Sequence, residues 1–320
     1  DFSQGESSHY YQLVRNIGFS GLFLLLTVLI ISGGVEQGIE KWSSRLMPSL
    51  FALMLALIVY VLTQDGASEG LKHYLVPDFS QITNPDLIVS AMGQAFFSMS
   101  LGVGTMLVYG SYIRADENLP TVGALVTLTD TSIAFLAGLL VLPAIFVAQK
   151  LGVTVYSDSG SLIAGPDLIF QVLPALFDGM GAAGLFVGFA FFVLMSIAAV
   201  TSSISMLEVP VSYAVESHKI DRQTATWIIG LIIFGISTAI SLNFDSLFGF
   251  VITLTTERAQ PLLSMMICIF AGWIFYRHTI LNELKSGNPS IESGLFWKLW
   301  PAYVKFVCPL LILLTFAQGF

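Results

Sequence analysis

Long apolar runs, interrupted by short polar segments, form the dominant pattern of the chain. A helix needs about 20 mostly apolar residues to cross a bilayer, and eight segments approach or exceed that length when small residues within them are accepted. Transmembrane strands are excluded, because no segment alternates apolar and polar residues with a period of two. The sequence therefore predicts an all-α polytopic membrane protein whose eight helices occupy residues 18–35, 48–63, 87–113, 128–148, 181–208, 227–242, 248–276 and 300–318.

Composition agrees with this class. Of the 320 residues, 55% are hydrophobic and 11% are charged, whereas roughly a quarter of the residues in a soluble domain are charged. A chain this apolar needs most of its surface against the lipid bilayer. The net charge of -8 disfavours nucleic acid as a partner, since phosphate binding requires clustered Lys and Arg. Both cysteines, Cys268 and Cys308, lie in apolar runs and predict neither a disulfide framework nor a metal site.

Basic residues are distributed unequally between alternate loops, which predicts the orientation of the helices. By the positive-inside rule the basic loops are cytoplasmic, so the loops at 65–86 and 149–180 are extracellular and both chain ends lie outside. The polar residues 1–11 contain nothing that could translocate them, so we expect an odd number of helices upstream; a removed signal peptide is the alternative. The basic loops, which follow the first, third, fifth and seventh predicted helices, contain Lys41, Arg45, Arg114, Lys219, Arg222, Arg277, Lys285 and Lys298.

Small residues gather in the middle of the third predicted helix, where Ser98, Ser100, Gly102 and Gly104 alternate with larger side chains. Glycine weakens helices, and serine competes for backbone hydrogen bonds. The pattern therefore indicates a break at membrane depth, whose freed carbonyls and amides could bind an ion or a zwitterion. A tightly packed face of small residues explains the same pattern equally well.

Consecutive hydroxyl residues mark the fifth predicted helix. Thr201 and Ser202, with the carbonyl of Ala198 one turn earlier, could surround a hard cation with oxygen. Hydroxyls in apolar helices more often bond back to their own helix, and spacing alone favours that alternative.

Few carboxylates fall within the apolar segments. Asp130 lies near the start of the fourth predicted helix and is a functional candidate, because a carboxylate is costly in hydrocarbon; a position in headgroup water is the alternative. Glu208 ends the fifth segment beside Pro210, and we expect it at the membrane interface. The four histidines fall in predicted tails and loops without metal-ligand spacing, and no catalytic motif is present, so the sequence does not predict an enzyme.

Four stretches resemble the neurotransmitter:sodium symporters, in particular bacterial amino-acid transporters with the leucine-transporter fold. Residues 93–113, GQAFFSMSLGVGTMLVYGSYI, resemble the sixth helix of that family, and residues 198–206, AAVTSSISM, resemble the eighth. Residues 34–51 resemble the junction of the fourth and fifth helices, and residues 165–177 resemble a short helix in the extracellular loop before the eighth. The resemblance implies that residues 1–320 form one transporter domain holding helices four to eleven, with the first three missing.

The resemblance also implies a substrate and ion site. Ser98 and Asp130 would supply oxygens to one sodium ion, and Ala198, Thr201 and Ser202 would hold a second. Gln94 matches a polar residue near the outer gate, and Phe97 matches the lid over the substrate. The positions that match the substrate pocket are Phe97, Ser98, Ser100, Val103, Ser202 and Met206.

Two positions depart from the family pattern. The outer-gate carboxylate has no clear counterpart, and Asp245 is the candidate nearest to it. Four residues beyond Asp130, where chloride-independent members often carry an acid, this chain has Ala134. Because Asp130 itself replaces the commoner asparagine, we expect it to supply the fixed negative charge and chloride to be dispensable.

Taken with the resemblance, these features predict a sodium-coupled symporter of a small amino acid or related amine in the plasma (inner) membrane, working by alternating access. The resemblance places the other broken helix of the fold among the missing three, so we expect this chain to need them, in cis or in trans. The alternatives are an ion channel, which the absence of a ring of like charges disfavours, and a non-transporting ligand sensor or scaffold.

Overall fold

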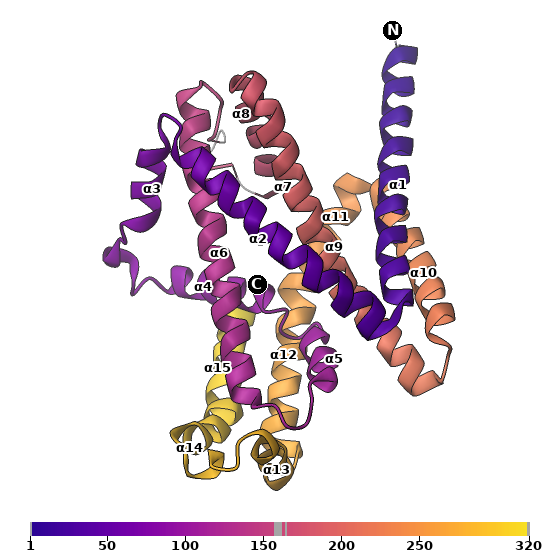
Figure 1. The fold of residues 1–320 in the computed structure, drawn as a ribbon, viewed down its shortest axis with the longest axis vertical. Helices are drawn as coiled ribbons and strands as arrows, with labels where there is room; N and C mark the ends of the chain where they lie inside the picture. Colours follow the sequence, from indigo (N-terminus) through magenta and orange to yellow (C-terminus); the bar gives the residue numbers. More distant parts are fainter. Residues whose placement is uncertain (1, 157–161, 164, 319–320) are drawn as a thin grey trace. The chain divides into compact units, whose positions relative to one another are not determined.

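The computed structural model describes residues 2–156, 162–163 and 165–318, and most of these residues are helical. The long helices are α1 (Phe2–Ser32), α2 (Lys41–Leu62), α6 (Leu119–Lys150), α9 (Ala182–His218) and α10 (Arg222–Leu242) (Figure 1). The shorter helices are α3 (Ala67–Leu75), α4 (Pro85–Ser98), α5 (Thr105–Tyr112), α7 (Gly165–Asp167), α8 (Leu173–Gly179), α11 (Phe244–Ile252), α12 (Gln260–Ile269), α13 (Arg277–Gly287), α14 (Leu295–Ala302) and α15 (Cys308–Gln318).

Several helices are joined through π-helical or 3-10 turns rather than through loops. The π-helical segments are η1 (Val35–Glu40), η3 (Leu168–Val172), η4 (Thr253–Ala259), η5 (Phe270–Ile274) and η7 (Tyr303–Val307), and the 3-10 turns are η2 (Phe79–Gln81) and η6 (Ile291–Ser293). The chain divides into two compact units. Unit 1 comprises Asp1–Ile39, Gln81–Leu128 and Ser203–Phe320, and unit 2 comprises Glu40–Ser80 and Thr129–Ser202.

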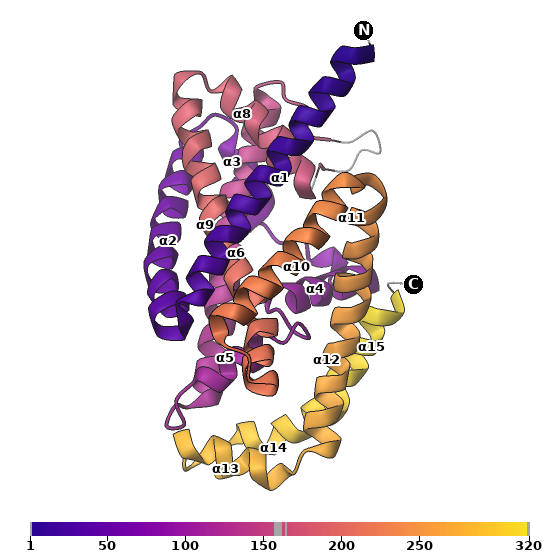
Figure 2. The ribbon, with the colours of Figure 1, turned by 90° about the vertical axis from the view of Figure 1, so that its right-hand side faces the viewer.

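Within unit 1, α1 packs along α10, and α12 packs along α15 (Figures 1 and 2). Small residues permit the first contact: a Cβ added at Gly230 would lie 2.6 Å from a methyl carbon of Val28, and one added at Gly21 would lie 3.2 Å from the ring of Phe234. Close approach at small residues is how helices associate in lipid, where no hydrophobic difference separates the interface from the surroundings.

Unit 2 has its own apolar core, built from α2, α6, α8 and the first part of α9. Leu57, Ala144, Leu176 and Phe191 are buried there. On the same unit, α3 lies against α6, and the Tyr74 hydroxyl donates a hydrogen bond of 3.2 Å to the carbonyl of Phe135. The predicted extracellular loop at 65–86 thus contains a helix, α3, and the loop at 149–180 contains α7, η3 and α8.

Six helices in the described residues are long and apolar enough to cross a membrane, or seven if a pair bent by 99° at residues 275–276 counts as one span. The bent pair contains the seventh predicted helix, and the third predicted helix accounts for the remaining difference from eight, because it is divided into α4 and α5, each too short to qualify alone. The second predicted helix begins earlier than expected: α2 starts at Lys41 and continues through Pro48, which lies inside it.

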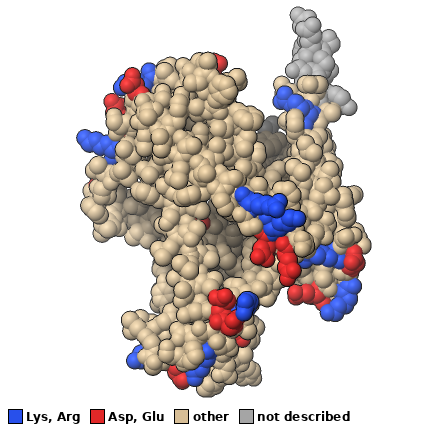
Figure 3. Space-filling model, in the orientation of Figure 1, with Lys and Arg blue, Asp and Glu red and all other residues tan. Residues whose placement is uncertain are grey.

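Large apolar side chains cover much of the outer surface, as on α9, where Leu185, Phe186 and Phe189 are each more than 70% exposed. On the face seen in Figure 3, charged side chains gather in a few groups separated by broad uncharged areas. Such a surface suits hydrocarbon surroundings. The protein is therefore a multi-pass membrane protein.

Candidate functional site

The third predicted helix is broken where its small residues gather. α4 ends at Ser98, and α5 begins at Thr105. Gly102 and Gly104 have φ values of +81° and +95°, which glycine adopts without steric cost. Ser100 has a φ of +50°, a left-handed conformation that costs a residue with a side chain roughly 1–2 kcal/mol. The structure therefore favours the break over a continuous helix with a small-residue face.

A side chain from α12 supports the end of α4. The Gln260 amide donates a hydrogen bond of 2.9 Å to the carbonyl oxygen of Phe96, which also accepts the amide hydrogen of Leu101 at 3.0 Å. Gln260 is buried, and the backbone of Gly102 lies close against it: a Cβ at Gly102 would come within 2.3 Å of the Gln260 carbonyl oxygen. The unwound segment is thus held directly on α12.

The predicted substrate residues of unit 1 face outward in the described part of the chain. Phe97, Val103 and Met206 are exposed, and Ser98 and Ser100 are half-buried. These residues lie on the broken segment and on α9, and each is at least partly exposed. Ser100 also lines a cavity within unit 1, and the roles of all five residues in substrate binding stay predictions.

The two gate residues lie on different helices. Gln94 is exposed on α4. Asp245 lies in the first turn of α11, but its side chain falls outside the described residues. The structure therefore leaves the expected outer gate as a prediction.

The hydroxyl residues of the predicted second sodium site lie on α9 within unit 2. Thr201 is buried, and its hydroxyl donates to the carbonyl of Ala198 at 2.9 Å or to that of Ile197 at 3.1 Å. Ser202, the next residue, is exposed. The backbone bonding that spacing favoured is thus observed for Thr201. The same oxygens are hard donors, so the chemistry of the set also fits a hard cation.

The residues of the predicted first sodium site come from separate elements. Ser98 is the last residue of α4, in unit 1, and Asp130 is half-buried in α6, in unit 2. Their joint role in binding one ion stays a prediction.

The structure also contains a buried charge network that the sequence did not predict. Glu208 is fully buried, with a side chain that accepts one hydrogen bond from Tyr112 and one from Arg222, both at 2.5 Å. Arg222 also donates to the carbonyl of Ile31 at 3.1 Å, so the network joins α1, α5, α9 and α10 within unit 1. The expectation that the fifth segment ends at Glu208 is wrong, because α9 continues past it to His218; its position relative to the membrane interface stays a prediction.

Two further hydroxyl hydrogen bonds connect α9 to neighbouring helices. Tyr109 donates to the Ser205 hydroxyl at 3.1 Å, and the hydroxyls of Thr27 and Ser203 share a hydrogen bond of 2.7 Å. The sequence contained one indication of this network: a carboxylate within an apolar segment usually pairs with another polar or charged group. Its partner could not be read from the sequence, because Arg222 was expected in a loop.

Comparisons with known proteins place the chain among transporters. A model of the sodium:neurotransmitter symporter family matches residues 17–320. YhdH of Bacillus subtilis, described as an uncharacterized sodium-dependent transporter, is 32% identical over 313 residues, which are 95% of this chain and 66% of that protein. An uncharacterized sodium-dependent transporter of Haemophilus influenzae is 34% identical over 309 residues, which are 95% of this chain and 65% of that protein.

A solved structure matches this chain over a similar share of its length. The crystal structure of MhsT in complex with L-phenylalanine has 36% sequence identity and a TM-score of 0.79, and the match covers 95% of this chain and 68% of that one. The chain thus spans about two thirds of the length of these relatives.

Proposed function

Because this chain belongs to the sodium:neurotransmitter symporter family, we propose that the protein carrying it is a sodium-coupled symporter of a small amino acid or related amine. The observation that carries the proposal is the unwound segment between Ser98 and Thr105. A helix broken at membrane depth offers carbonyls and amides to a ligand, which an unbroken helix cannot do. The bound L-phenylalanine of MhsT, a relative of the same fold, supports an amino-acid substrate.

In this proposal the substrate lies against the unwound segment. Phe97 covers it from outside, and Ser98 and Ser100 contact its polar groups. Val103 and Met206, both apolar and exposed in this chain, contact its side chain. Ser202, on α9, is the remaining residue that contacts the substrate in this proposal.

Two sodium ions couple the gradient to substrate movement. Ser98 and Asp130 contribute oxygens to one ion, and Ala198, Thr201 and Ser202 contribute oxygens to the other. Sodium that binds better to the outward-facing conformation increases the population of that conformation, and hence the apparent affinity for substrate. The carboxylate of Asp130 supplies fixed negative charge, so transport does not require chloride. Uptake that disappears when chloride is replaced by gluconate would contradict this last point.

Alanine at Thr201 and Ser202 tests the ion site. We expect the double variant to lose sodium-dependent binding of a labelled amino acid, measured in detergent with potassium as the comparison ion. The control is Ser196→Ala on the same helix, where the hydroxyl donates a hydrogen bond to the carbonyl of Phe192. Sodium-dependent binding that survives in the double variant would favour a ligand sensor or scaffold instead.

The extent of the functional unit is a separate prediction. We expect residues 1–320 alone to be transport-incompetent, because the resemblance assigns part of the site to three further helices. Saturable, sodium-dependent accumulation by these residues alone in proteoliposomes would refute that expectation without affecting the family assignment.

A further inference from the structure

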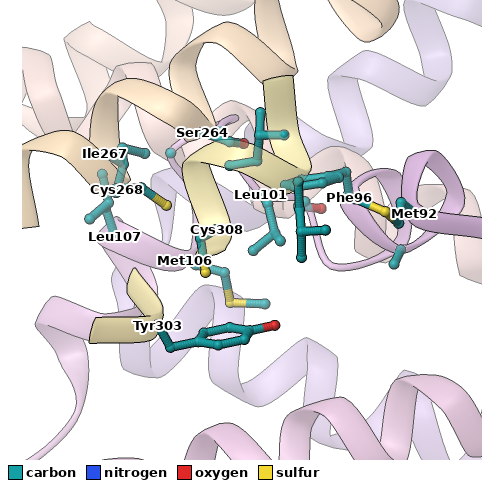
Figure 4. A pocket seen from close by; sticks show the side chains of 16 residues that line it. Met92, Phe96, Leu101, Met106, Leu107, Ser264, Ile267, Cys268, Tyr303 and Cys308 are labelled. Atoms are coloured by element: carbon teal, nitrogen blue, oxygen red, sulfur yellow. The ribbon is translucent and has the colours of Figure 1, made fainter. Parts of the chain in front are cut away.

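A cavity of about 440 Å³ lies within unit 1 beside the unwound segment. It is lined mainly by apolar side chains from α4, α5, α12 and α15. Four of the lining residues carry sulfur, one from each of these helices. They are Met92, Met106, Cys268 and Cys308 (Figure 4).

The two cysteines of the chain meet in this cavity. Cys268 lies on α12, and Cys308 is the first residue of α15; both are free thiols and half-buried. Both side chains line the cavity, and Figure 4 shows their sulfur atoms in it. Figure 4 shows the sulfur atom of Met106 in the same part of the cavity. Three sulfur atoms from three helices are therefore brought together.

The donor types select one class of ion. Thiolate and thioether sulfur are soft ligands that prefer Cu(I) and similar ions. Zinc is an unsuitable occupant, because a structural zinc site takes four nitrogen or sulfur ligands, and no three His, Cys, Asp or Glu among the described residues are arranged to hold a metal ion. Hard cations need oxygen ligands. A soft monovalent ion with low coordination number fits best.

The cost of a net charge in the membrane determines how many of the two thiols lose a proton when a cation binds. Cys268 and Cys308 lie in the membrane-spanning segments Ser246–Ile274 and Leu295–Leu314, where a net charge is costly. A monovalent cation bound to one thiolate gives a neutral complex. One thiol then loses its proton as the metal–sulfur bond forms, while the other thiol and the thioether donate lone pairs without losing protons.

We propose that Cys268, Cys308 and Met106 form a binding site for a soft monovalent cation of the Cu(I) class, separate from the predicted sodium sites. Composition predicted no metal site for these cysteines. Their separation in the sequence gives no ligand spacing, and only the packing of α12 on α15 brings them together.

Silver is a suitable probe, because Ag(I) has the same ligand preferences and does not change oxidation state during the experiment. The purified protein is titrated with Ag(I) by calorimetry, and proton release is recorded in a weakly buffered solution. We expect one high-affinity Ag(I) that is lost in Cys268→Ser and in Cys308→Ser, with one proton released per ion. Met106→Leu should weaken binding by at least about tenfold, as loss of a supporting ligand commonly does.

The matched control is Met266→Leu, an exposed methionine on α12 that does not line the cavity and should leave Ag(I) binding unchanged. X-ray absorption of the Ag(I)-loaded wild-type protein should show sulfur neighbours only, and this measurement does not depend on whether a variant folds. A first shell of oxygen or nitrogen, or binding that persists unchanged in both serine variants, would overturn the proposal.

Discussion

The Gln260 side-chain amide donates a hydrogen bond to the carbonyl oxygen of Phe96, 2.9 Å away, and so links α12 to the point where α4 unwinds. Helix ends leave carbonyls without intrahelical partners, and these must be satisfied where no water is available. Gln260 meets that need from another helix. The break is therefore supported by α12, and it does not depend on its own small residues alone.

Replacing Gln260 with leucine removes this donor while keeping a similar volume. We expect the free energy of unfolding to fall by about 1 kcal/mol, since Phe96 retains its bond from Leu101. Transport should fall as well, because the unwound segment loses a fixed position. Thermal unfolding in detergent and uptake in proteoliposomes measure the two effects. The same change at the partly exposed Gln64 should alter neither; equal effects at both sites would contradict a specific role for Gln260.

Gly102→Ala should damage the unwound segment. The glycine has a φ of +81°, and a Cβ there would lie 2.5 Å from the Ser264 hydroxyl and closer still to the carbonyl of Gln260. Backbone strain alone costs about 1–3 kcal/mol, and the steric overlap adds to it. We expect a clear loss of thermal stability and of substrate binding.

Gly93→Ala provides the control, because a Cβ at Gly93 on α4 would meet no atom within 4 Å. This variant should retain stability and binding. Normal binding by Gly102→Ala would mean that the segment adopts a different backbone when ligand is bound.

Arg222→Ala should be strongly destabilising. It leaves the fully buried Glu208 without its cation, and breaking a buried pair in this way costs about 3–5 kcal/mol. Adding Glu208→Gln should recover part of the loss, because the uncompensated charge is then removed. Thermal unfolding should therefore give a lower Tm for Arg222→Ala alone than for Arg222→Ala combined with Glu208→Gln.

The comparison pair lies on the surface. Arg114 and Asp116 form an exposed ion pair at 3.0 Å, and Arg114→Ala should change stability by less than about 1 kcal/mol. An effect of Arg222→Ala as mild as that of Arg114→Ala would contradict a stabilising role for the buried pair.

The loop after α13 gives a pH-dependent prediction. A hydrogen bond and ion pair with Lys285 hold the pKa of Glu292 below its usual value of 4.5. A lowered folded-state pKa contributes stability above the unfolded pKa, and this contribution is lost as pH falls through the folded pKa. Glu292→Gln should therefore lower Tm slightly at neutral pH, and the difference should shrink below pH 4.5. The control is Glu283→Gln on α13, which leaves the Lys285–Glu292 pair intact and should not reproduce this pH dependence; a persistent effect of Glu292→Gln at low pH would argue against the pair.

Much of the fold follows from local pattern. Apolar segment length located the long helices, and the glycines near position 102 located the break, because both features act on the backbone where they occur. The predicted helix boundaries at Pro48 and Glu208 were less accurate. Proline often ends a helix, but α2 continues through Pro48 and α9 continues through Pro210. The hydroxyls of Thr201 and Ser202 were also visible as a motif.

Long-range partners could not be predicted in the same way. The pairs Glu208–Arg222, Gln260–Phe96 and Cys268–Cys308 depend on which helices pack together and at what rotation. The periodicity of a sequence predicts that a segment is helical, but it does not predict which face of that helix packs against a given neighbouring helix. Similarly, a shared role for Ser98 and Asp130 requires two elements to meet, and it stays a prediction.

The most direct test of the central claim is accumulation of a labelled amino acid by the full-length protein that carries this chain, purified and placed in proteoliposomes under an inward sodium gradient. Sodium-coupled symport predicts saturable accumulation above the outside concentration, lost when potassium replaces sodium outside and reduced by alanine at Thr201 and Ser202. Equilibration without accumulation, or currents that do not saturate with substrate, would contradict the account and favour a channel.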